Sequence, residues 1–391
     1  MDASRICMAG ARPCRYARGH VRHFKEKGWR HVPTRRRNWH HVLLIIGLLS
    51  VLGGSNTGHA QGSESAILDI AWSPNGEMLA TVDRNGTLNV TLPSENILVV
   101  QFVQSFSLNE ATVEWSLQGD FLAVGIGNLV SIWDSTTWNL RHQFIAGDSD
   151  GVTNYYSTET SEGIINIRWS TDGQYIVTGS LSYVTTVWSQ SESRIVYQGV
   201  DASSGGPGRV WLSNNGWMSD GVSRLNAFTG ELFRANRSES PNAFLASAEG
   251  ASTDPRPDNT QLAWGTVHGE LLIVNAEALI LESGIRVKYN TDPNSMLLGI
   301  ADISWDSTWN FIAVASRDGE LYVVNLITEE VASVFNIDGQ LTSVDWNPQT
   351  NQVTYAGVSS AGEAILETVD VSGVAGVPEV AVAPAPTQAS G

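Results

Sequence analysis

Cysteine is almost absent from this 391-residue chain, since Cys7 and Cys14 lie near the N-terminus and none follows. Beyond them the chain has no disulfide framework, no thiolate nucleophile and no cysteine metal site. The rest of the chain must therefore be stabilised by an apolar core, and a chain of this length can bury a large one.

Histidine and lysine are scarce beyond residue 60, where His142, His268 and Lys288 are the only ones. A serine or cysteine hydrolase needs a base beside its nucleophile, and neither histidine lies in a triad-like setting. Gly125-Ile126-Gly127 links two predicted strands rather than a strand and a helix, so it is not a dinucleotide-binding loop. The sequence predicts no catalytic residue, no metal ligand set and no cofactor.

Basic residues are concentrated instead in residues 1–41, which hold 11 Lys/Arg and two acids. The apolar run Val42–Leu52 follows, and its 11 residues are too few to span a bilayer, which takes about 20. Small residues then lead to Ala60, an order typical of a signal peptide. We expect residues 1–60 to be a basic leader and signal peptide, cleaved after Ala60. Two other interpretations of the run are an uncleaved anchor and a buried strand.

Removal of such a leader leaves a strongly acidic chain. The totals of 23 basic and 40 acidic residues fall to 12 and 38, a net charge near −26. A surface of this charge repels phosphate backbones and anionic lipids, which disfavours nucleic-acid binding and membrane association. The charge serves solubility or attracts a basic partner.

A repeated motif organises the remainder: a tryptophan closes a short apolar strand, and a polar turn and a second apolar strand follow. Trp72-Ser73-Pro74-Asn75-Gly76 is one instance, before Met78–Val82. The residue after the closing position recurs at steps of 41 to 54 residues, at Ser73, Ser116, Ser170, Ser213, Arg256, Asp306 and Asn347. Seven units with about this period predict a β-propeller with four strands per blade.

The sixth unit has the clearest strand pattern, with runs rich in β-branched and aromatic residues at Ala301–Trp305, Phe311–Ser316, Glu320–Leu326 and Val331–Ile337. Its middle runs are joined through Asp318-Gly319, and the same hairpin of the first unit uses Asn85-Gly86. Such dipeptides supply the positive φ that tight hairpin turns need.

The pattern resembles the WD-repeat β-propeller family across about residues 64–371. The resemblance rests on the tryptophan and its polar turn, the paired apolar strands and the Asx-Gly hairpins. The Trp-Asp dipeptide that ends the third strand occurs there once, at Trp133-Asp134, and the family's Gly-His dipeptide is absent from the links between blades. The resemblance implies an all-β, seven-bladed propeller of four-stranded antiparallel blades.

We expect this propeller to occupy residues 61–371, followed by an Ala/Val/Pro-rich tail over residues 372–391. The first strand of the first blade begins near Ile67, so the seventh blade needs an outer strand from elsewhere in the chain. Two segments could supply it, Glu379–Val382 of the tail and Gly62–Ala66.

The insertion Ala146–Gly163 is the predicted partner-binding site. It contains the tyrosine pair Tyr155 and Tyr156 and no Lys or Arg, and its acids include Asp148, Asp150 and Glu159. Tyrosines beside unpaired acids suit a protein interface, because tyrosine combines a large contact area with a polar tip. The family resemblance implies that this link lies on a face used for partners.

We therefore predict an exported, non-catalytic and monomeric scaffold for a protein partner of basic character, located outside the cell, in the periplasm or at the cell surface. One alternative is a carbohydrate-active hydrolase or lyase with paired carboxylates in the central funnel. A second is a cation-binding structural propeller, because Asp148-Ser149-Asp150-Gly151 resembles half of a calcium loop.

Overall fold

The computed structural model describes residues 66–103, 110–146, 163–180, 184–200, 210–211, 216–219, 223–229, 231–234, 250–256, 258, 260–288 and 299–378. These residues form strands and turns, and none of them belongs to a helix long and apolar enough to cross a membrane.

Seven antiparallel sheets follow one another along the chain, and we number them as blades one to seven. Blades one to three contain β1 (Ile67–Trp72), β2 (Leu79–Asp83), β3 (Thr87–Leu92), β4 (Ile97–Val103), β5 (Ala111–Trp115), β6 (Phe121–Ile126), β7 (Leu129–Asp134), β8 (Leu140–Ile145), β9 (Ile164–Trp169), β10 (Tyr175–Ser180), β11 (Val184–Ser189) and β12 (Arg194–Val200).

Blades four and five contain β13 (Val210–Trp211), β14 (Trp217–Ser219), β15 (Ser223–Asn226), β16 (Leu232–Arg234), β17 (Gly250–Pro255), β18 (Gln261–Thr266), β19 (Glu270–Asn275) and β20 (Ile280–Arg286). Blades six and seven contain β21 (Ile300–Trp305), β22 (Phe311–Ser316), β23 (Glu320–Asn325), β24 (Glu330–Asn336), β25 (Gly339–Trp346), β26 (Gln352–Ser359) and β27 (Ala364–Asp370).

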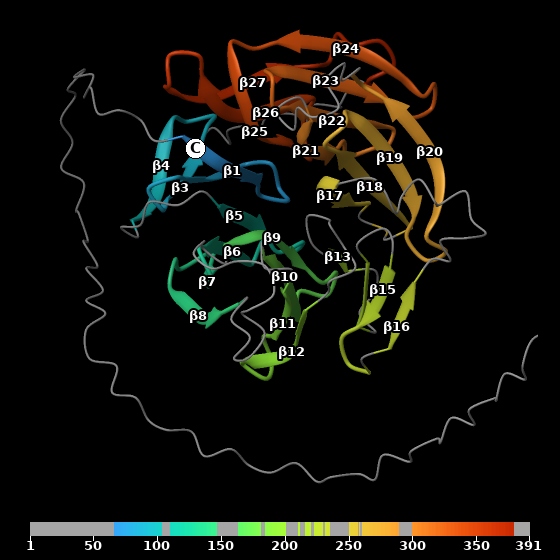
Figure 1. Cartoon of the computed structure of the whole chain (residues 1–391). Helices are drawn as coiled ribbons and strands as arrows, with labels where there is room; N and C mark the ends of the chain where they lie inside the picture. The colour runs from blue at the N-terminus through green and yellow to red at the C-terminus, as the bar shows by residue number, and fades with distance from the viewer. Residues whose placement is uncertain are drawn as a thin grey trace, which may run out of the picture. The chain divides into compact units, whose positions relative to one another are not determined.

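The first strand of each blade lies innermost, and the seven inner strands form a closed ring. Each inner strand contacts the inner strand of the next blade, and β25 contacts β1. Figure 1 shows the inner strands gathered around a common axis, with β4, β8, β12, β16, β20 and β24 at the periphery. The predicted all-β propeller is confirmed. In blade seven the described residues form a three-stranded sheet.

The recurring tryptophans join neighbouring blades. The indole Nε1 of Trp115 donates to the carbonyl of Ala71 in blade one at 3.0 Å, and that of Trp305 donates to the carbonyl of Asp254 in blade five at 3.1 Å. Apolar side chains from adjacent blades pack beside these bonds, as in the cluster that contains Val82, Val90, Trp115 and Val124. The repeat period therefore encodes the contacts between blades.

The hairpin glycines have the predicted positive φ, 74° at Gly86 and 87° at Gly319. A Cβ at Gly319 would also lie 2.4 Å from the carbonyl oxygen of Ile337, so no other residue fits there.

Blade four differs by one residue from the predicted alignment. Trp211 of β13 pairs with Met218, as Trp72 pairs with Leu79 in blade one. The residue after the closing position is therefore Leu212 rather than Ser213.

Both predicted closing segments lie largely outside the described residues. Of Gly62–Ala66, only Ala66 is described, and its carbonyl accepts from the amide of Arg84 at 2.9 Å, which places it in blade one. Glu379–Val382 lies outside the described part of the chain. The residues just before it return to the ring: Val371 and Val377 pack in a cluster with Phe311.

The seam between blades seven and one depends on Thr354, whose Oγ1 accepts from the indole Nε1 of Trp72 at 3.1 Å. We expect Thr354→Val to lower the free energy of unfolding by about 1–2 kcal/mol, because it leaves that buried N–H without an acceptor. Urea unfolding monitored by tryptophan fluorescence measures this loss. Thr368→Val is the matched control: Thr368 is exposed and bonds the same hydroxyl from the outer side, so a loss as large as that of Thr354→Val would contradict the assignment.

Candidate functional site

The inner strands carry polar side chains one and three residues before their closing position. Side chains alternate along a strand, so these positions share a face, while the residues between them point into the blades. Ile70, Val113, Ile167, Ile303 and Val344 occupy those intervening positions and are buried. The polar positions face the middle of the ring and are held by Asp69, Thr112, Glu114, Asn166, Arg168, Ser252, Asp254, Asp302, Ser304, Ser343 and Asp345.

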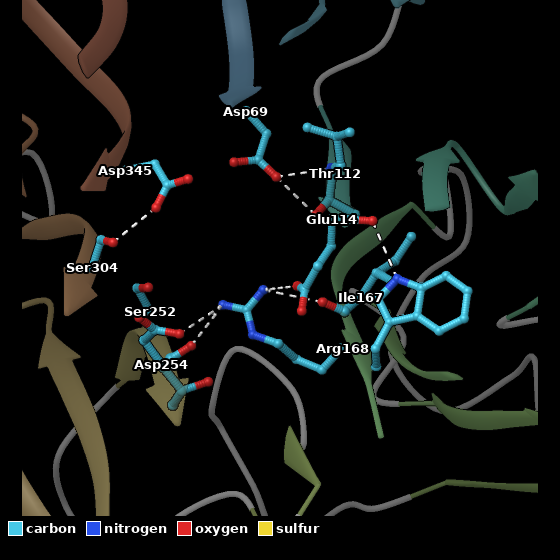
Figure 2. Close-up of polar contacts among 12 residues, drawn as sticks. Asp69, Thr112, Glu114, Ile167, Arg168, Ser252, Asp254, Ser304 and Asp345 are labelled. Atoms are coloured by element: carbon cyan, nitrogen blue, oxygen red, sulfur yellow. Dashed lines mark hydrogen bonds and ion pairs between the residues drawn. The ribbon is translucent and has the colours of Figure 1, made fainter. Parts of the chain in front are cut away.

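All of these residues except Ser343 line a central cavity of about 500 Å³. Its wall begins beside Leu68 and Thr342, near the first residues of the inner strands, and extends to Pro74, Leu117 and Pro348 in the turns that follow them. Leu117 is 50% exposed there. Figure 2 shows Asp69, Glu114, Arg168, Asp254 and Asp345 arranged around this space.

Asp69 and Asp302 share the hydroxyl of Ser343, whose Oγ lies 2.8 Å from Asp69 Oδ1 and 2.9 Å from Asp302 Oδ2. Asp69 Oδ2 also accepts from the amide of Val113 in blade two at 2.9 Å, and Asp302 Oδ2 accepts from the amide of Val344 in blade seven at 3.0 Å. The carboxylates thus satisfy inner-strand N–H groups that no further strand pairs with, and so tie the blades together.

Asp345 and Asp254, which lie one residue before the closing position of their strands, also accept from backbone amides of the next blade. Asp345 Oδ2 accepts from the amide of Trp72 at 2.6 Å, and Asp254 Oδ2 accepts from the amide of Trp305 at 3.3 Å. Asp345 Oδ1 also accepts from the hydroxyl of Ser304 at 2.8 Å. Each bond joins one blade to the next.

Arg168 is the cation of this cavity among the described residues. Its guanidinium Nη1 donates to Glu114 Oε2 at 2.5 Å, and Nη2 donates to the carbonyl of Thr253 at 2.9 Å. Nη2 also lies 3.9 Å from Asp254 Oδ1. The side chains of Arg168, Glu114 and Asp254 are 19%, 23% and 25% exposed, so the charges are largely removed from bulk water.

Desolvation raises the pKa of four of these carboxyls. It raises that of Asp69 to about 6, with the charge of Asp302 adding to it, and that of Asp345 to about 8, against the lowering effect of the Trp72 amide. It raises the pKa of Glu114 to about 7 and that of Asp254 to about 6, although the positive charge of Arg168 opposes both shifts. The cavity therefore holds carboxyls that gain or lose protons near neutral pH.

Arg168 remains charged throughout this range. Desolvation acts to lower its pKa, but the negative charges of Glu114, Asp254 and Asp302 outweigh that effect and raise it above its usual value. Five inner-strand carboxyls thus face one guanidinium among the described residues, which gives the cavity a negative potential when the acids are ionised.

The predicted partner-binding residues Tyr155, Tyr156, Asp148, Asp150 and Glu159 lie outside the described residues. The two flanks of their insertion are described. The amide of Ala146 donates to the carbonyl of Asn128 at 2.9 Å, and that of Ile164 donates to the carbonyl of Gly127 at 2.7 Å. The insertion therefore leaves and rejoins the ring beside the β6–β7 turn.

The cavity residues were not named as a site by the sequence reasoning, which raised carboxylates in a central funnel only as an alternative. A signal was present: an acid lies one or three residues before the recurring tryptophan in Asp69-x-x-Trp72, Glu114-Trp115, Asp302-x-x-Trp305 and Asp345-Trp346. Lys288, the one lysine beyond residue 60, pairs with Asp318 and Glu320 of blade six.

Comparison with known proteins gives two matches. The sequence model described as "WD domain, G-beta repeat" matches residues 52–90, a range that begins within the predicted leader and ends in β3. The chain is also 31% identical over 115 residues to "Periodic tryptophan protein 2" of Arabidopsis thaliana. This similarity covers 29% of the chain and 12% of that protein.

Proposed function

We propose that this β-propeller, which is similar to WD-repeat proteins, is an exported, non-catalytic scaffold that binds a protein partner through its inter-blade loops. WD-repeat propellers generally bind proteins, and a ring of covalently linked, mutually bonded blades presents its loops with little loss of conformational entropy on binding. The acidic surface favours a basic partner and a monomeric, soluble protein.

One observation carries this proposal: every described inner-strand carboxyl at the cavity is held by another blade. Asp69, Asp302 and Asp345 accept from backbone amides of the following blade, and Glu114 and Asp254 face Arg168 of blade three. A glycosidase needs two carboxyls that reach substrate, one as acid and one as base or nucleophile. Carboxyls engaged in closing the ring favour a structural role over that chemistry.

The insertion Ala146–Gly163 is the proposed contact site. The described residues at its two ends, Ala146 and Ile164, donate to the carbonyls of Asn128 and Gly127 at the β6–β7 turn, so the insertion begins and ends where blades two and three meet. Tyr155 and Tyr156 would supply apolar contact area, and Asp148, Asp150 and Glu159 would orient a basic partner.

Replacing Tyr155 and Tyr156 together by Ala is expected to weaken partner binding at least about tenfold, because aromatic anchors dominate such interfaces. The partner is first captured from the native exported fraction, and its affinity is then measured by calorimetry. Ile327→Ala is the control, since Ile327 is 72% exposed on the β23–β24 turn of blade six. Equal affinity of the tyrosine variant and the control would contradict this site.

The two alternatives have direct tests. A hydrolase or lyase would release sugar from a glycan panel and would lose activity in Glu114→Gln, a carboxyl whose pKa of about 7 suits a general acid. A calcium-binding propeller would melt at a higher temperature with calcium than with magnesium. Absence of both effects in the full chain would leave the scaffold proposal.

A further inference from the structure

Leu366 of β27 is exposed at a position where other blades bury a leucine. It pairs with Ala356 of β26, and the leucines that hold the same register position in the third strands of blades one, five and six are Leu88, Leu271 and Leu321. These three side chains are 2%, 0% and 0% exposed, whereas Leu366 is 42% exposed. The group that covers the other leucines is therefore missing from the described part of blade seven.

The fourth strand provides this cover in the other blades. Its residue opposite the leucine is large and apolar in all three. The pairs are Phe102 with Leu88, Ile285 with Leu271, and Phe335 with Leu321. Within the described residues the sheet of blade seven ends at β27, so a fourth strand is what Leu366 lacks.

The backbone of β27 also carries hydrogen-bonding groups on this outer edge. The amide of Val371 donates to the carbonyl of Asn351 at 2.8 Å, on the side of β26. Amides point alternately to the two sides of a strand, and β26 and β27 pair without a register shift, so the amides of Leu366 and Thr368 point away from β26. No other described strand pairs with this edge. A row of such groups is a template for one more strand.

The turn after β27 begins like the turn that leads into β24. Asp370 Oδ1 accepts from the amide of Ser372 at 2.8 Å, as Asn325 Oδ1 accepts from the amide of Ile327 at 2.8 Å. Asp370 and Asn325 hold the same register position at the end of their strands. The local structure at the end of β27 therefore matches that of a strand followed by an outer strand.

The chain then returns to this end of blade seven. Asn351 Nδ2 donates to the carbonyl of Pro378 at 2.7 Å. Asn351 directly precedes Gln352, which pairs with Asp370, the last residue of β27. The chain therefore continues from Pro378 beside the point where a fourth strand, antiparallel to β27, would begin.

The sequence that follows Pro378 matches an outer strand. Glu379-Val380-Ala381 repeats Glu330-Val331-Ala332, the first three residues of β24. Phe335 of β24, five residues after Glu330, is opposite Leu321, and the corresponding residue of the tail is Pro384. A proline ring at this position would cover Leu366 with apolar surface. Proline is tolerated on an edge strand, and its missing N–H would end the ladder at that point.

We infer that the outer edge of β27 binds Glu379–Pro384 of the same chain as the fourth strand of blade seven, antiparallel to β27 and in the register of β24. Val382 is then opposite Thr368 and Pro384 is opposite Leu366, while the amide of Ala383 points to solvent. This strand completes the ring with C-terminal residues and covers an edge that other chains could pair with. The inference does not rest on the proposed function.

Hydrogen exchange of the full chain, resolved to single residues by mass spectrometry, tests the inference at the amides of Leu366 and Thr368. Both should exchange at least about tenfold more slowly than in an unfolded chain. Val382→Pro removes the N–H that faces β27 and should accelerate both amides at least about tenfold. Ala383→Pro is the matched control, because the N–H that it removes points to solvent, and it should change either rate by less than about twofold.

The amides of β22 report on the fold and should exchange equally in wild type and both variants. Exchange of Leu366 and Thr368 at unfolded rates in wild type would show an empty edge and overturn the inference. Slow exchange that neither proline alters would also overturn it, because another segment, such as Val42–Leu52, or a second chain then covers the edge. Equal acceleration by both prolines contradicts the register and with it the inference.

A second measurement uses the scarcity of cysteine and needs no variant that breaks the pairing. In a full chain with Cys7→Ser and Cys14→Ser, Leu366→Cys is combined with Pro384→Cys or with Ala383→Cys. Residues directly opposite each other in an antiparallel pair have Cα atoms about 5.5 Å apart, within disulfide range, whereas the neighbouring side chain points to the other face. We expect at least about tenfold more intramolecular disulfide with position 384 than with position 383. Equal yields would contradict strand pairing.

Discussion

Replacing Arg168 by Met is expected to lower the free energy of unfolding by about 3 kcal/mol at pH 8, since it leaves Glu114 and Asp254 inside the ring without a cation. The ion pair to Glu114 joins blades two and three, and the contacts with Thr253 and Asp254 reach blade five. One side chain thus links three inner strands across the cavity. Methionine fills a similar volume and preserves the apolar stem contacts.

The loss should be smaller at pH 5, because the uncompensated carboxyls then bind protons and become neutral. Urea unfolding of wild type and Arg168→Met at pH 8 and at pH 5 measures the loss of unfolding free energy at each pH. Arg194→Met is the matched control: Arg194 pairs with Glu192 on blade three, and their side chains are 62% and 47% exposed. An exposed pair of this kind is worth less than about 1 kcal/mol. Equal losses in the two variants would show that the cavity ion pair does not stabilise the ring.

The second large effect is the pH dependence of the wild-type protein, whose unfolding free energy is expected to fall by about 3 kcal/mol between pH 5 and pH 8. The pKa values of Asp69, Asp254, Glu114 and Asp345 are about 6, 6, 7 and 8 in the fold, all above those of an unfolded chain. The folded state therefore holds protons that the unfolded state has released.

The raised pKa values determine the direction in which the free energy of unfolding changes with pH. Stability from a raised carboxyl pKa is fully present below the unfolded value near 4 and is lost as the pH rises through the folded value. The window runs from about pH 5 to pH 8, because the folded pKa values lie between about 6 and about 8. The carboxyls share one cavity, so their contributions do not add, and the expected change is near that of the largest single shift.

The variant Asp345→Asn tests whether ionisation of Asp345 causes the loss of stability at high pH. An amide cannot ionise, and its oxygen can accept from the Trp72 amide while its nitrogen donates to Ser304. The variant is expected to lose less stability than wild type between pH 7 and pH 9 and to resemble it at pH 5. Asp370→Asn, an exposed carboxyl of β27 with a lowered pKa, is the control and should keep the wild-type slope above pH 7. If the unfolding free energy of Asp345→Asn falls with pH as steeply as that of wild type above pH 7, Asp345 is not the group responsible.

The sequence predicted the features that local chemistry encodes. Alternating side chains, Asx-Gly hairpins and the recurring tryptophan gave the strands of blade six to within one residue at most ends, as comparison of Phe311–Ser316 with β22 shows. Blade four was misaligned by one residue because its inner strand, Val210–Trp211, is followed by Leu212 instead of a polar turn residue. In a short strand without the usual polar turn, the sequence pattern does not identify the closing position.

The sequence by itself thus determined the repeat, the all-β architecture and the packing of tryptophans between blades, because each depends on residues within one period. Only the tertiary structure decided that Asp69, Asp302, Ser343 and Asp345 meet at one cavity, with Asn166 and Arg168 facing the same space. These residues lie in blades one, three, six and seven, up to about 270 positions apart, and each is an ordinary polar residue in its own strand. Closure of the ring brings β25 against β1 and so creates the site, since strand alternation specifies which face a side chain occupies but not which distant side chains share it.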